Sequence, residues 1–321
     1  MTRLHIVGAS GYAAGEVIRF AVKHPRLELG ALESESAAGR PLGEIFPALR
    51  RVDRTFDAPG AVERSLQPGD AVIFGSGNGV ALSRAPQMVE RGAKVIDLSS
   101  DFRHDPAAVY GLPERHRSEL AGASLVANPG CYPTGTLLAL APLAPWAAQI
   151  RQLIVDAKSG ISGAGRTPKT ATLFCEVDGD VVAYGLEGHR HHREMVAELK
   201  ASGIERPLLF TPQMVPLKRG MLVSAYAVFD AAPSEAEVLE AYHAAYQREP
   251  FVHLVTVAPS LAGVLGTNDA ELHVSVVGPT VRVICAIDNL GKGAATQALQ
   301  SLNVMLGFPE EEGLHARALI A

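Results

Sequence analysis

The chain has 321 residues, of which 47% are hydrophobic and 20% are charged, and its formal net charge is −5. This composition is ordinary for a soluble globular protein, and the length suggests two domains. The sequence contains no basic block, so we expect no nucleic-acid partner. We also expect a cytoplasmic protein with no membrane segment, because there is no signal-peptide layout and no apolar run of spanning length.

Three cysteines, Cys131, Cys175 and Cys285, are spread over the chain. They are too few and too scattered for a disulfide framework or a zinc site. A reducing compartment and no bound metal are therefore expected.

The first 32 residues show a strand, a glycine-rich turn, a helix and a second strand. The apolar run 4–7 stops at Gly8, small residues and glycines fill 8–15, apolar residues recur at helical spacing in 17–21, and 27–32 is strand-like. Glycines allow a backbone to approach a pyrophosphate at a helix N-terminus, so this pattern predicts a dinucleotide-binding unit. The spacing is not the strict G-x-G-x-x-G, and a generic strand-to-helix turn remains the alternative.

Two more strands, 71–74 and 94–98, end in small or polar residues. Gly75 to Gly79 follows the first, and Ser99 to Arg103 follows the second. Ligands bind where parallel strands end, so both ends are candidate walls of a site. The alternatives are a flexible glycine loop and a solvated charged turn.

Residues 128–134, Asn-Pro-Gly-Cys-Tyr-Pro-Thr, join the apolar run 125–127 to a helix expected at 136–143. Pro129 and Gly130 predict a turn, and Pro133 suits the first turn of a helix. Cys131 would then lie at the positive end of a helix dipole, where the nucleophilic thiolate is favoured. The alternative is a small residue packed in a turn.

Beyond Cys131, a strand at 153–158 leads into a second glycine-rich loop, 159–166, which ends at Arg166. Its backbone donors and Arg166 suit an anion, although a flexible tether explains the loop equally well. Three histidines lie within residues 188–193, where neighbouring arginines disfavour a metal cation. A catalytic histidine is therefore expected there, with a solvated basic loop as the alternative.

The rest of the chain is rich in strands. Strands are expected at 222–229, 272–277 and 281–288, and Ser234 with Glu237 forms a capping box that predicts a helix. This pattern indicates a largely antiparallel sheet with helices on one face. A final helix spans 294–305 and stops at Gly307.

A dinucleotide site, a thiolate and a histidine together suit one chemistry. The thiolate attacks an activated acyl carbon to give a thioester, and hydride from a reduced nicotinamide leads through a thiohemiacetal to an aldehyde. Histidine would move protons, and backbone N–H groups near the helix N-terminus would stabilise the oxyanion. The partner is thus expected to be a small-molecule acyl phosphate.

Several motifs, in this order, resemble the N-acetyl-gamma-glutamyl-phosphate reductases of arginine biosynthesis. They are residues 8–12, 97–103, 110–114, 128–134, 158–166, 188–191, 215–220, 266–268 and 286–293. The resemblance implies the fold class of glyceraldehyde-phosphate and aspartate-semialdehyde dehydrogenases, α/β, with a Rossmann-type domain and an α+β domain with a mixed or antiparallel sheet. The expected bounds are 1–130 with 289–321 for the dinucleotide domain, and 131–288 for a catalytic and dimerisation domain. A homo-oligomer, a dimer or tetramer, is also implied.

The resemblance also implies roles for single residues. Cys131 would be the nucleophile, and His189 is favoured over His191 as the acid/base. For the substrate, it implies Arg103, Asn128, Arg166, His191, Lys218 and Arg219. For the cofactor, it implies Gly8, Ser10, Gly11, Tyr12, Ala13, Ser34, Ser36, Gly75, Ser162, Gly163 and Asn289.

The sequence departs from the family after its second strand. The family commonly has Ser-Arg-Ser there, and its Arg can meet the 2′-phosphate of NADP, whereas this chain has Glu33-Ser34-Glu35-Ser36. NADPH is the cofactor that the resemblance implies, but carboxylates at Glu33 and Glu35 would repel a phosphate and so leave NAD open. Arg40 is a candidate for compensation. Gln213 also replaces a histidine that is frequent in the family.

Two alternative functions follow from the same residues. The carrier-protein-linked aminoadipyl- or glutamyl-phosphate reductases run the same chemistry, but their nucleophile motif usually reads Gly-Cys-Asn-Ala-Thr. Tyr132 and Pro133 follow the cysteine here, which favours a free substrate. A non-catalytic nucleotide-sensing protein on this fold is the other alternative, and the presence of Cys131 and His189 argues against it.

Overall fold

The computed structural model describes residues 1–318 and divides into two compact units. The first contains Met1–Gly130 and Ala294–His315, and the second contains Cys131–Gly293. These units differ from the predicted bounds at the return of the chain, which falls at Ala294 and not at Asn289. The predicted range 289–321 also includes residues 319–321, which lie outside the described residues.

The first unit contains a six-stranded sheet in the order β2-β1-β3-β4-β6-β5, and every neighbouring pair is parallel. The strands are β1 (Thr2–Val7), β2 (Leu27–Glu33), β3 (Ala71–Phe74), β4 (Lys94–Asp97), β5 (Val109–Tyr110) and β6 (Leu125–Ala127). The chain turns from β1 to β2 on one side and then continues on the other side with β3. The strand order therefore reverses between β1 and β3, where ligands of such sheets bind.

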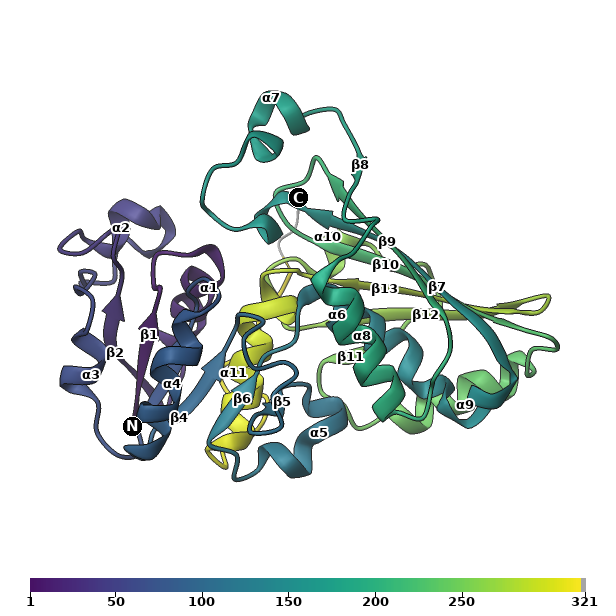
Figure 1. The fold of residues 1–321 in the computed structure, drawn as a ribbon, viewed down its shortest axis with the longest axis horizontal. Helices are drawn as coiled ribbons and strands as arrows, with labels where there is room; N and C mark the ends of the chain where they lie inside the picture. The colour runs from purple at the N-terminus through teal and green to yellow at the C-terminus, as the bar shows by residue number, and fades with distance from the viewer. Residues whose placement is uncertain (319–321) are drawn as a thin grey trace. The chain divides into compact units, whose positions relative to one another are not determined.

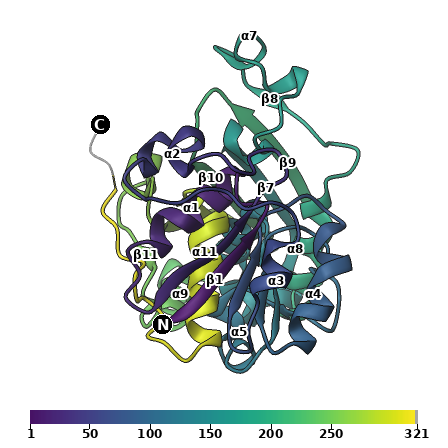
Figure 2. The same cartoon turned by 90° about the vertical axis from the view of Figure 1, so that its left-hand side faces the viewer.

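Helices of the first unit cover the sheet on both faces, as Figure 2 shows with β1 and α1 toward the viewer. Strand residues alternate between faces, and one face packs against α3 (Ala61–Ser65) and α4 (Val80–Glu90). On the other side α1 (Tyr12–Ala21) contacts α11 (Thr296–Met305), which also packs on β4 and on α5 (Pro113–Leu120). The short helices α2 (Leu42–Ile45) and η1 (Pro47–Leu49) complete the unit.

The second unit contains a mixed seven-stranded sheet in the order β11-β12-β13-β10-β7-β9-β8. Its strands are β7 (Ile150–Gly160), β8 (Val182–Ala183), β9 (Leu208–Val215), β10 (Met221–Phe229), β11 (Val252–Leu254), β12 (Ala270–Val277) and β13 (Thr280–Ile287). Pairing is antiparallel except between β11 and β12 and between β7 and β9. The predicted antiparallel centre is present, and each parallel pair joins a predicted strand, β7 or β12, to one that the sequence pattern did not indicate, β9 or β11.

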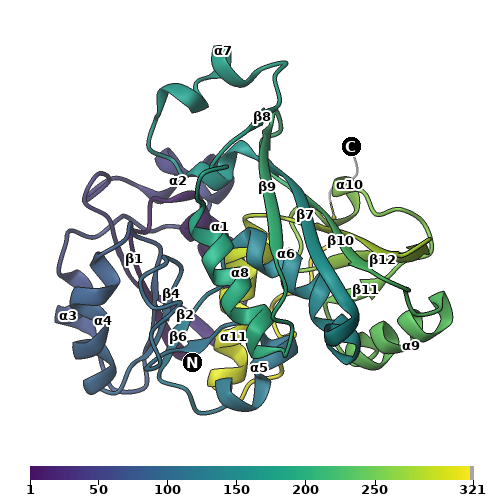
Figure 3. The same cartoon turned by 45° about the vertical axis from the view of Figure 1, so that its right-hand side comes forward.

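Helix α6 (Cys131–Leu140) lies directly on β10 and β13, and α8 (Arg190–Ala201) packs against α6, as Figure 3 shows. The approach to the sheet is close at Gly135, where an added Cβ would lie 2.8 Å from Val223. The helix begins at Cys131, five residues before the predicted start at 136. Pro133 is tolerated there because N–H groups of a first turn have no partner within the helix.

Helix α9 (Glu235–Tyr246) has the predicted capping box, in which Ser234 and Glu237 bind each other's backbone N–H. The remaining helices are η2 (Ala141–Gln149), η3 (Ile161–Ala164), η4 (Thr170–Thr172), α7 (Phe174–Val177), α10 (Leu261–Val264) and η5 (Gly291–Ala295). The segment that carries η4 and α7 extends away from the second sheet, and the chain returns to that sheet at β8, which pairs with β9 (Figure 1). In residues 1–318, none of the helices has the length and hydropathy that crossing a membrane requires.

Candidate active site

A tight turn follows β1 at the point where the strand order of the first unit reverses. Gly8 has φ +79°, and a Cβ there would lie 2.7 Å from the backbone N of Ser76. Gly8 and the Gly75 turn after β3 therefore touch backbone to backbone, which only glycine at position 8 permits. Gly11 caps α1, whose first turn carries no acidic residue. This cradle suits a pyrophosphate held by the N-terminus of a helix.

Three predicted cofactor residues, Ser10, Ser34 and Ser36, meet beside this turn. The Ser34 hydroxyl donates to Ser10 Oγ at 2.8 Å, and the Ser36 and Ser10 hydroxyls lie 3.5 Å apart. The backbone N–H of Ala37 donates to Ser34 Oγ, which fixes the loop after β2. The end of β2 thus presents hydroxyl groups where a ribose binds in folds of this kind. Tyr12 and Ala13, also predicted, form the first two residues of α1.

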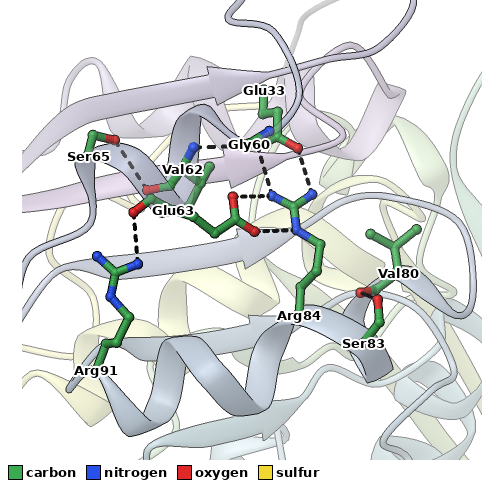
Figure 4. Close-up of polar contacts among 9 residues, drawn as sticks. All are labelled: Glu33, Gly60, Val62, Glu63, Ser65, Val80, Ser83, Arg84 and Arg91. Carbon is green, nitrogen blue, oxygen red and sulfur yellow. Dashed lines mark hydrogen bonds and ion pairs between the residues drawn. The ribbon is translucent and has the colours of Figure 1, made fainter.

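Glu33 does not present its carboxylate to this loop, contrary to the expectation from the sequence. Its side chain is 4% exposed and accepts hydrogen bonds from Arg84 at 2.6 and 2.9 Å and from the backbone N–H of Gly60 at 3.0 Å (Figure 4). Arg84 also binds both oxygens of Glu63. The carboxylate of Glu33 is thereby held inside the unit by Arg84, which it shares with Glu63, and it does not face the loop after β2.

Glu35 is the second carboxylate in the segment that differs from the family's Ser-Arg-Ser, and it is exposed. Arg40, the candidate for compensation, pairs with Glu44 at 3.1 Å, and both side chains are about half exposed. An exposed pair of this kind is weak, so Arg40 is only loosely held by it. The question of cofactor preference therefore concerns Glu35 and no longer Glu33.

Cys131 is the first residue of α6 and is partly exposed. This position places its thiol at the positive end of the helix, as the sequence indicated. Gly293 lies against it, since a Cβ at 293 would come within 2.8 Å of the Cβ of Cys131. The side chain of Cys131 also interacts electrostatically with the phenols of Tyr132 and Tyr184. Cys285, in contrast, is fully buried, and burial raises its pKa to about 12.

His189 is the N-cap residue of α8. Its Nδ1 accepts a hydrogen bond from the backbone N–H of His191 at 3.1 Å. Four rings surround it edge to face, with centroids 4.9 to 5.7 Å from that of His189: Tyr132, Tyr184, His191 and Phe210. Burial, followed by the charges of Arg190 and His192, lowers the pKa of His189 to about 4. The His189 ring is therefore neutral at physiological pH. The neighbouring His191 is buried, with 5% exposure.

The second glycine-rich loop pairs with the loop before β10. Ile161 and Ser162 donate backbone N–H groups to the carbonyls of Leu217 and Lys218, and Gly160 donates to Gly220. Asn289 joins the two loops, because its Oδ1 accepts from the N–H of Gly220 and its Nδ2 donates to Ser162 Oγ. Ser162, Gly163, Lys218, Arg219 and Asn289 are thus brought together in the second unit.

The predicted basic and amide residues differ in their surroundings. Arg219 forms an ion pair of 2.7 Å with the buried Asp288, while Lys218 and Arg166 are exposed. In the first unit, Arg103 donates to the carbonyls of Leu98 and Asn128. Asn128 is 1% exposed and donates to the carbonyls of Pro129 and Ala294. Arg103 and Asn128 therefore hold the backbone in place, and Arg219 is paired with a buried carboxylate. The side chains of Lys218 and Arg166 lie at the surface of the second unit.

Several residues near the site were missed in the sequence. Tyr184 donates to the hydroxyl of Tyr132 at 3.1 Å, and Tyr132 donates to the carbonyl of Gln213 at 3.2 Å. Gln213 itself binds both oxygens of Asp156, so it has a structural partner where the family often has histidine. Tyr132, adjacent to Cys131, and Gln213, a departure from the family, carried signals in the sequence; Tyr184 lies 52 residues from Tyr132 and has no distinctive motif.

The geometry suits covalent chemistry at a thiol. The second unit holds a partly exposed cysteine at a helix N-terminus and a neutral histidine within one aromatic cluster, and the first unit holds a cradle for a dinucleotide. Within the described residues, no cluster of His, Cys, Asp or Glu is placed to hold a metal ion. These groups can form a thioester and stabilise an oxyanion.

Comparison with known proteins agrees with this division. A model of the semialdehyde dehydrogenase NAD-binding domain matches residues 3–123, and one of the semialdehyde dehydrogenase dimerisation domain matches residues 131–289. Curated relatives named N-acetyl-gamma-glutamyl-phosphate reductase include one from Halorhodospira halophila, 43% identical over 100% of both chains. Others, from Dehalococcoides mccartyi and Brevibacillus brevis, are each 41% identical over 98% of both chains.

Solved structures with the same fold include aspartate semialdehyde dehydrogenases. That of Vibrio cholerae (form II, complexed with ASA) has a TM-score of 0.75 and 19% identity, over 95% of this chain and 98% of that one. That of Candida albicans, solved with NADP, has a TM-score of 0.70 and 15% identity, over 95% and 100% of the two chains. At these identities the likeness shows the fold alone, and it confirms the predicted fold class.

Proposed function

The chain belongs to the family of N-acetyl-gamma-glutamyl-phosphate reductases, and we propose that its own residues reduce N-acetyl-gamma-glutamyl phosphate to N-acetylglutamate semialdehyde and phosphate in arginine biosynthesis. Membership confirms the resemblance seen in the motifs and makes the protein an oxidoreductase with a small-molecule substrate. The observation that carries the proposal is Cys131 at the first residue of α6, in one aromatic cluster with His189.

The first chemical step forms a bond between Cys131 Sγ and the acyl carbon. The thiolate attacks, the carbonyl oxygen becomes an oxyanion, and the C–O bond to the phosphate breaks with its electron pair remaining on the phosphate. The departing phosphate takes a proton from solvent. Lys218 and Arg166, exposed beside the glycine loop, are proposed to hold the phosphate or the carboxylate of the substrate.

When bound, a reduced nicotinamide supplies the hydride that brings the acyl carbon to the oxidation level of an aldehyde. Cys131 then leaves as a thiolate, because the pair of the C–S bond returns to sulfur as the carbonyl reforms. The position of Cys131 at the start of α6 favours that thiolate in both directions.

For the cofactor, we propose NADPH, held by the first unit. The Gly8–Gly11 turn and the N-terminus of α1 would bind the pyrophosphate, and the hydroxyls of Ser10, Ser34 and Ser36 would face the ribose. The buried carboxylate of Glu33 is bound to Arg84 and does not face the loop after β2, which supports acceptance of a 2′-phosphate. The exposed carboxylate of Glu35 disfavours binding of the 2′-phosphate. We therefore propose that NADH is used as well, and that the preference for NADPH over NADH is smaller than a basic residue at position 35 would give.

The protein is further proposed to be a cytoplasmic homo-oligomer. The matched dimerisation domain supports this, as does one face of the second sheet, on which alternate residues stay partly exposed. Ile154, Tyr226 and Arg282 are neighbours across three strands of that face. Light scattering coupled to gel filtration measures the assembly, and Tyr226→Glu is expected to weaken it.

The deciding experiment is Cys131→Ser, assayed with N-acetylglutamyl phosphate and NADPH. Because a serine hydroxyl is a far weaker nucleophile than a thiolate, we expect kcat/KM to fall by about 10⁴-fold or more. Binding of NADPH, followed by fluorescence titration, should stay unchanged. Full activity in this variant would refute the thioester mechanism, and a wild-type protein that binds cofactor without reducing the acyl phosphate would indicate a sensing role.

A further inference from the structure

Residues 184–189 form a tight turn between β8 and α8. The backbone N–H of Gly188 donates to the carbonyl of Gly185 at 3.2 Å, and Gly185 has φ +62°. A Cβ at Gly185 would lie 3.0 Å from Cδ2 of His189, so the turn passes directly against the imidazole. The two ends of the turn meet, because the rings of Tyr184 and His189 pack edge to face with centroids 5.5 Å apart.

The first end of this turn is anchored on β9. Ala183 pairs with Gln213, and the backbone N–H of Tyr184 donates to the carbonyl of Pro212 at 3.1 Å. The backbone of Tyr184 is therefore held by the second sheet, although the segment before β8 extends away from that sheet.

The hydroxyls of Tyr184 and Tyr132 can carry their protons in one order only. The Tyr132 hydroxyl lies 3.2 Å from the backbone carbonyl of Gln213, and a carbonyl can only accept. Tyr132 therefore donates its one proton to Gln213, and its oxygen accepts from the Tyr184 hydroxyl at 3.1 Å. Tyr184 is thus the first donor of the chain, and it acts on the residue next to Cys131.

Tyr184 is also the exposed member of the ring cluster around His189. Its side chain is 37% exposed, whereas the other three rings, those of Tyr132, His191 and Phe210, are all buried. The cluster therefore meets solvent at Tyr184.

We propose that Tyr184 is a positioning residue for the reaction: its ring covers the exposed side of His189, and its hydroxyl fixes Tyr132 beside Cys131. This assignment rests on the proposed acyl-phosphate reduction. The proton of Tyr184 is already bound to Tyr132, and burial raises the pKa of the phenol, so Tyr184 is neutral at physiological pH. Tyr184 therefore acts through its neighbours and supplies neither an acid nor a base.

Two substitutions separate the hydroxyl from the ring. Tyr184→Phe removes the bond to Tyr132 and leaves both the cover on His189 and the bond from Tyr132 to Gln213. We expect kcat to fall about fivefold with KM unchanged, the effect of one neutral hydrogen bond. Tyr184→Ala also removes the ring, and kcat should fall about 10²-fold, as for a misplaced reacting group. A merely structural role would lower the unfolding temperature and leave kcat unchanged.

A double-mutant cycle tests whether the hydroxyl acts through Tyr132. In the Tyr132→Phe background its acceptor is absent, so adding Tyr184→Phe should change kcat by less than about twofold. A further fivefold loss in that background would show that the hydroxyl acts elsewhere, which would overturn this part of the proposal.

The cover on His189 is measured independently of activity. Burial is the largest cause of its lowered pKa, ahead of the charges of Arg190 and His192 on α8. The other titratable rings that face it are His191 and the two neutral phenols. Loss of the cover therefore raises the pKa by exposing the imidazole to water.

Histidine-labelled protein gives this pKa from the NMR shift of the Cε1–H group, and the signal absent from His189→Asn identifies His189. We expect a midpoint of about 4 in the wild type and in Tyr184→Phe, and of about 5 or higher in Tyr184→Ala. Phe174→Ala, at an exposed aromatic residue of α7, is the control and should leave the midpoint and kcat unchanged.

The two readouts decide the proposal separately from the proposed function. An unchanged midpoint in Tyr184→Ala, or wild-type kcat in Tyr184→Phe, would overturn the role of Tyr184. Absence of acyl-phosphate reduction in the wild type would overturn the proposed function, while the titration of His189 would still support or overturn the cover by Tyr184.

Discussion

Arg84 donates two hydrogen bonds to the carboxylate of Glu33, at 2.6 and 2.9 Å, from a position 51 residues further along the chain. The pair joins the end of β2 to α4, and the pKa of Arg84 is raised chiefly by this hydrogen bond. From the sequence alone, Glu33 is expected to repel a phosphate. In the structure its carboxylate instead stabilises the first unit.

Cofactor preference should respond to Glu35 and not to Glu33. Removing the exposed charge in Glu35→Gln is expected to raise the NADPH:NADH ratio of kcat/KM about fivefold, the effect of roughly 1 kcal/mol between two charges about 4 Å apart in water. Glu33→Gln should change the ratio less than twofold but lower the unfolding free energy by about 1–3 kcal/mol, because Arg84 loses its buried partner. The opposite ranking would show that Glu33 turns toward the cofactor.

Alkylation should distinguish the three cysteines. Iodoacetamide at pH 7.5, followed by peptide mass spectrometry, is expected to modify Cys131 fastest, because α6 favours its thiolate. Cys285 should remain unmodified in the folded protein, since burial raises its pKa to about 12. Cys175 is exposed, so its rate of modification in the same protein is the internal reference. Equal rates at Cys131 and Cys175 would mean that the helix does not activate the thiol.

Gly293 should be intolerant of any side chain. In Gly293→Ala the new Cβ would lie 2.8 Å from the Cβ of Cys131, and the nucleophile must move. We expect kcat to fall about 10²-fold, as for a misplacement of roughly 1 Å. Wild-type rates in Gly293→Ala would show that the site adapts.

Stability should depend on pH through His189. Its pKa is about 4 in the folded protein against an ordinary value of 6.5, so between these values the unfolded chain binds the proton more readily. This contribution is complete above pH 6.5 and is lost as the pH falls toward 4. From pH 6.5 to 4.5, urea unfolding should show His189→Asn losing about 1 kcal/mol less than the wild type, after allowance for the partial exposure of the ring. Parallel curves for the two proteins would place the pKa of the folded histidine near its ordinary value.

Much of the fold was predictable because the elements are determined locally. The apolar runs at β3 and β6, the capping box of Ser234 and Glu237, and the stop at Gly307 (φ +67°) depend on neighbouring residues only. The family was predictable for a similar reason, since its motifs are contiguous in the chain.

The functional detail depends on distant partners, and the sequence does not show those. The role of Glu33 depends on its ion pair with Arg84. Arg219 is paired with Asp288, which lies 69 residues further along the chain. The Nδ1 of His189 is likewise already bound, to a backbone N–H at the start of α8. The sequence shows which side chains are present, but only the structure shows which of them are bound to one another.

The return of the chain to the first unit limits how such proteins can recombine. Gln297 and Ser301 of α11 both donate to the carbonyl of Gly111, and Arg117 pairs with Glu310 at 2.7 Å. A crossover at Gly130 alone would therefore combine α11 from one parent with α1, α5 and β4 from the other. A functional chimera has to exchange residues 1–130 and 294–315 together, so a change of cofactor domain by recombination requires two crossovers and not one.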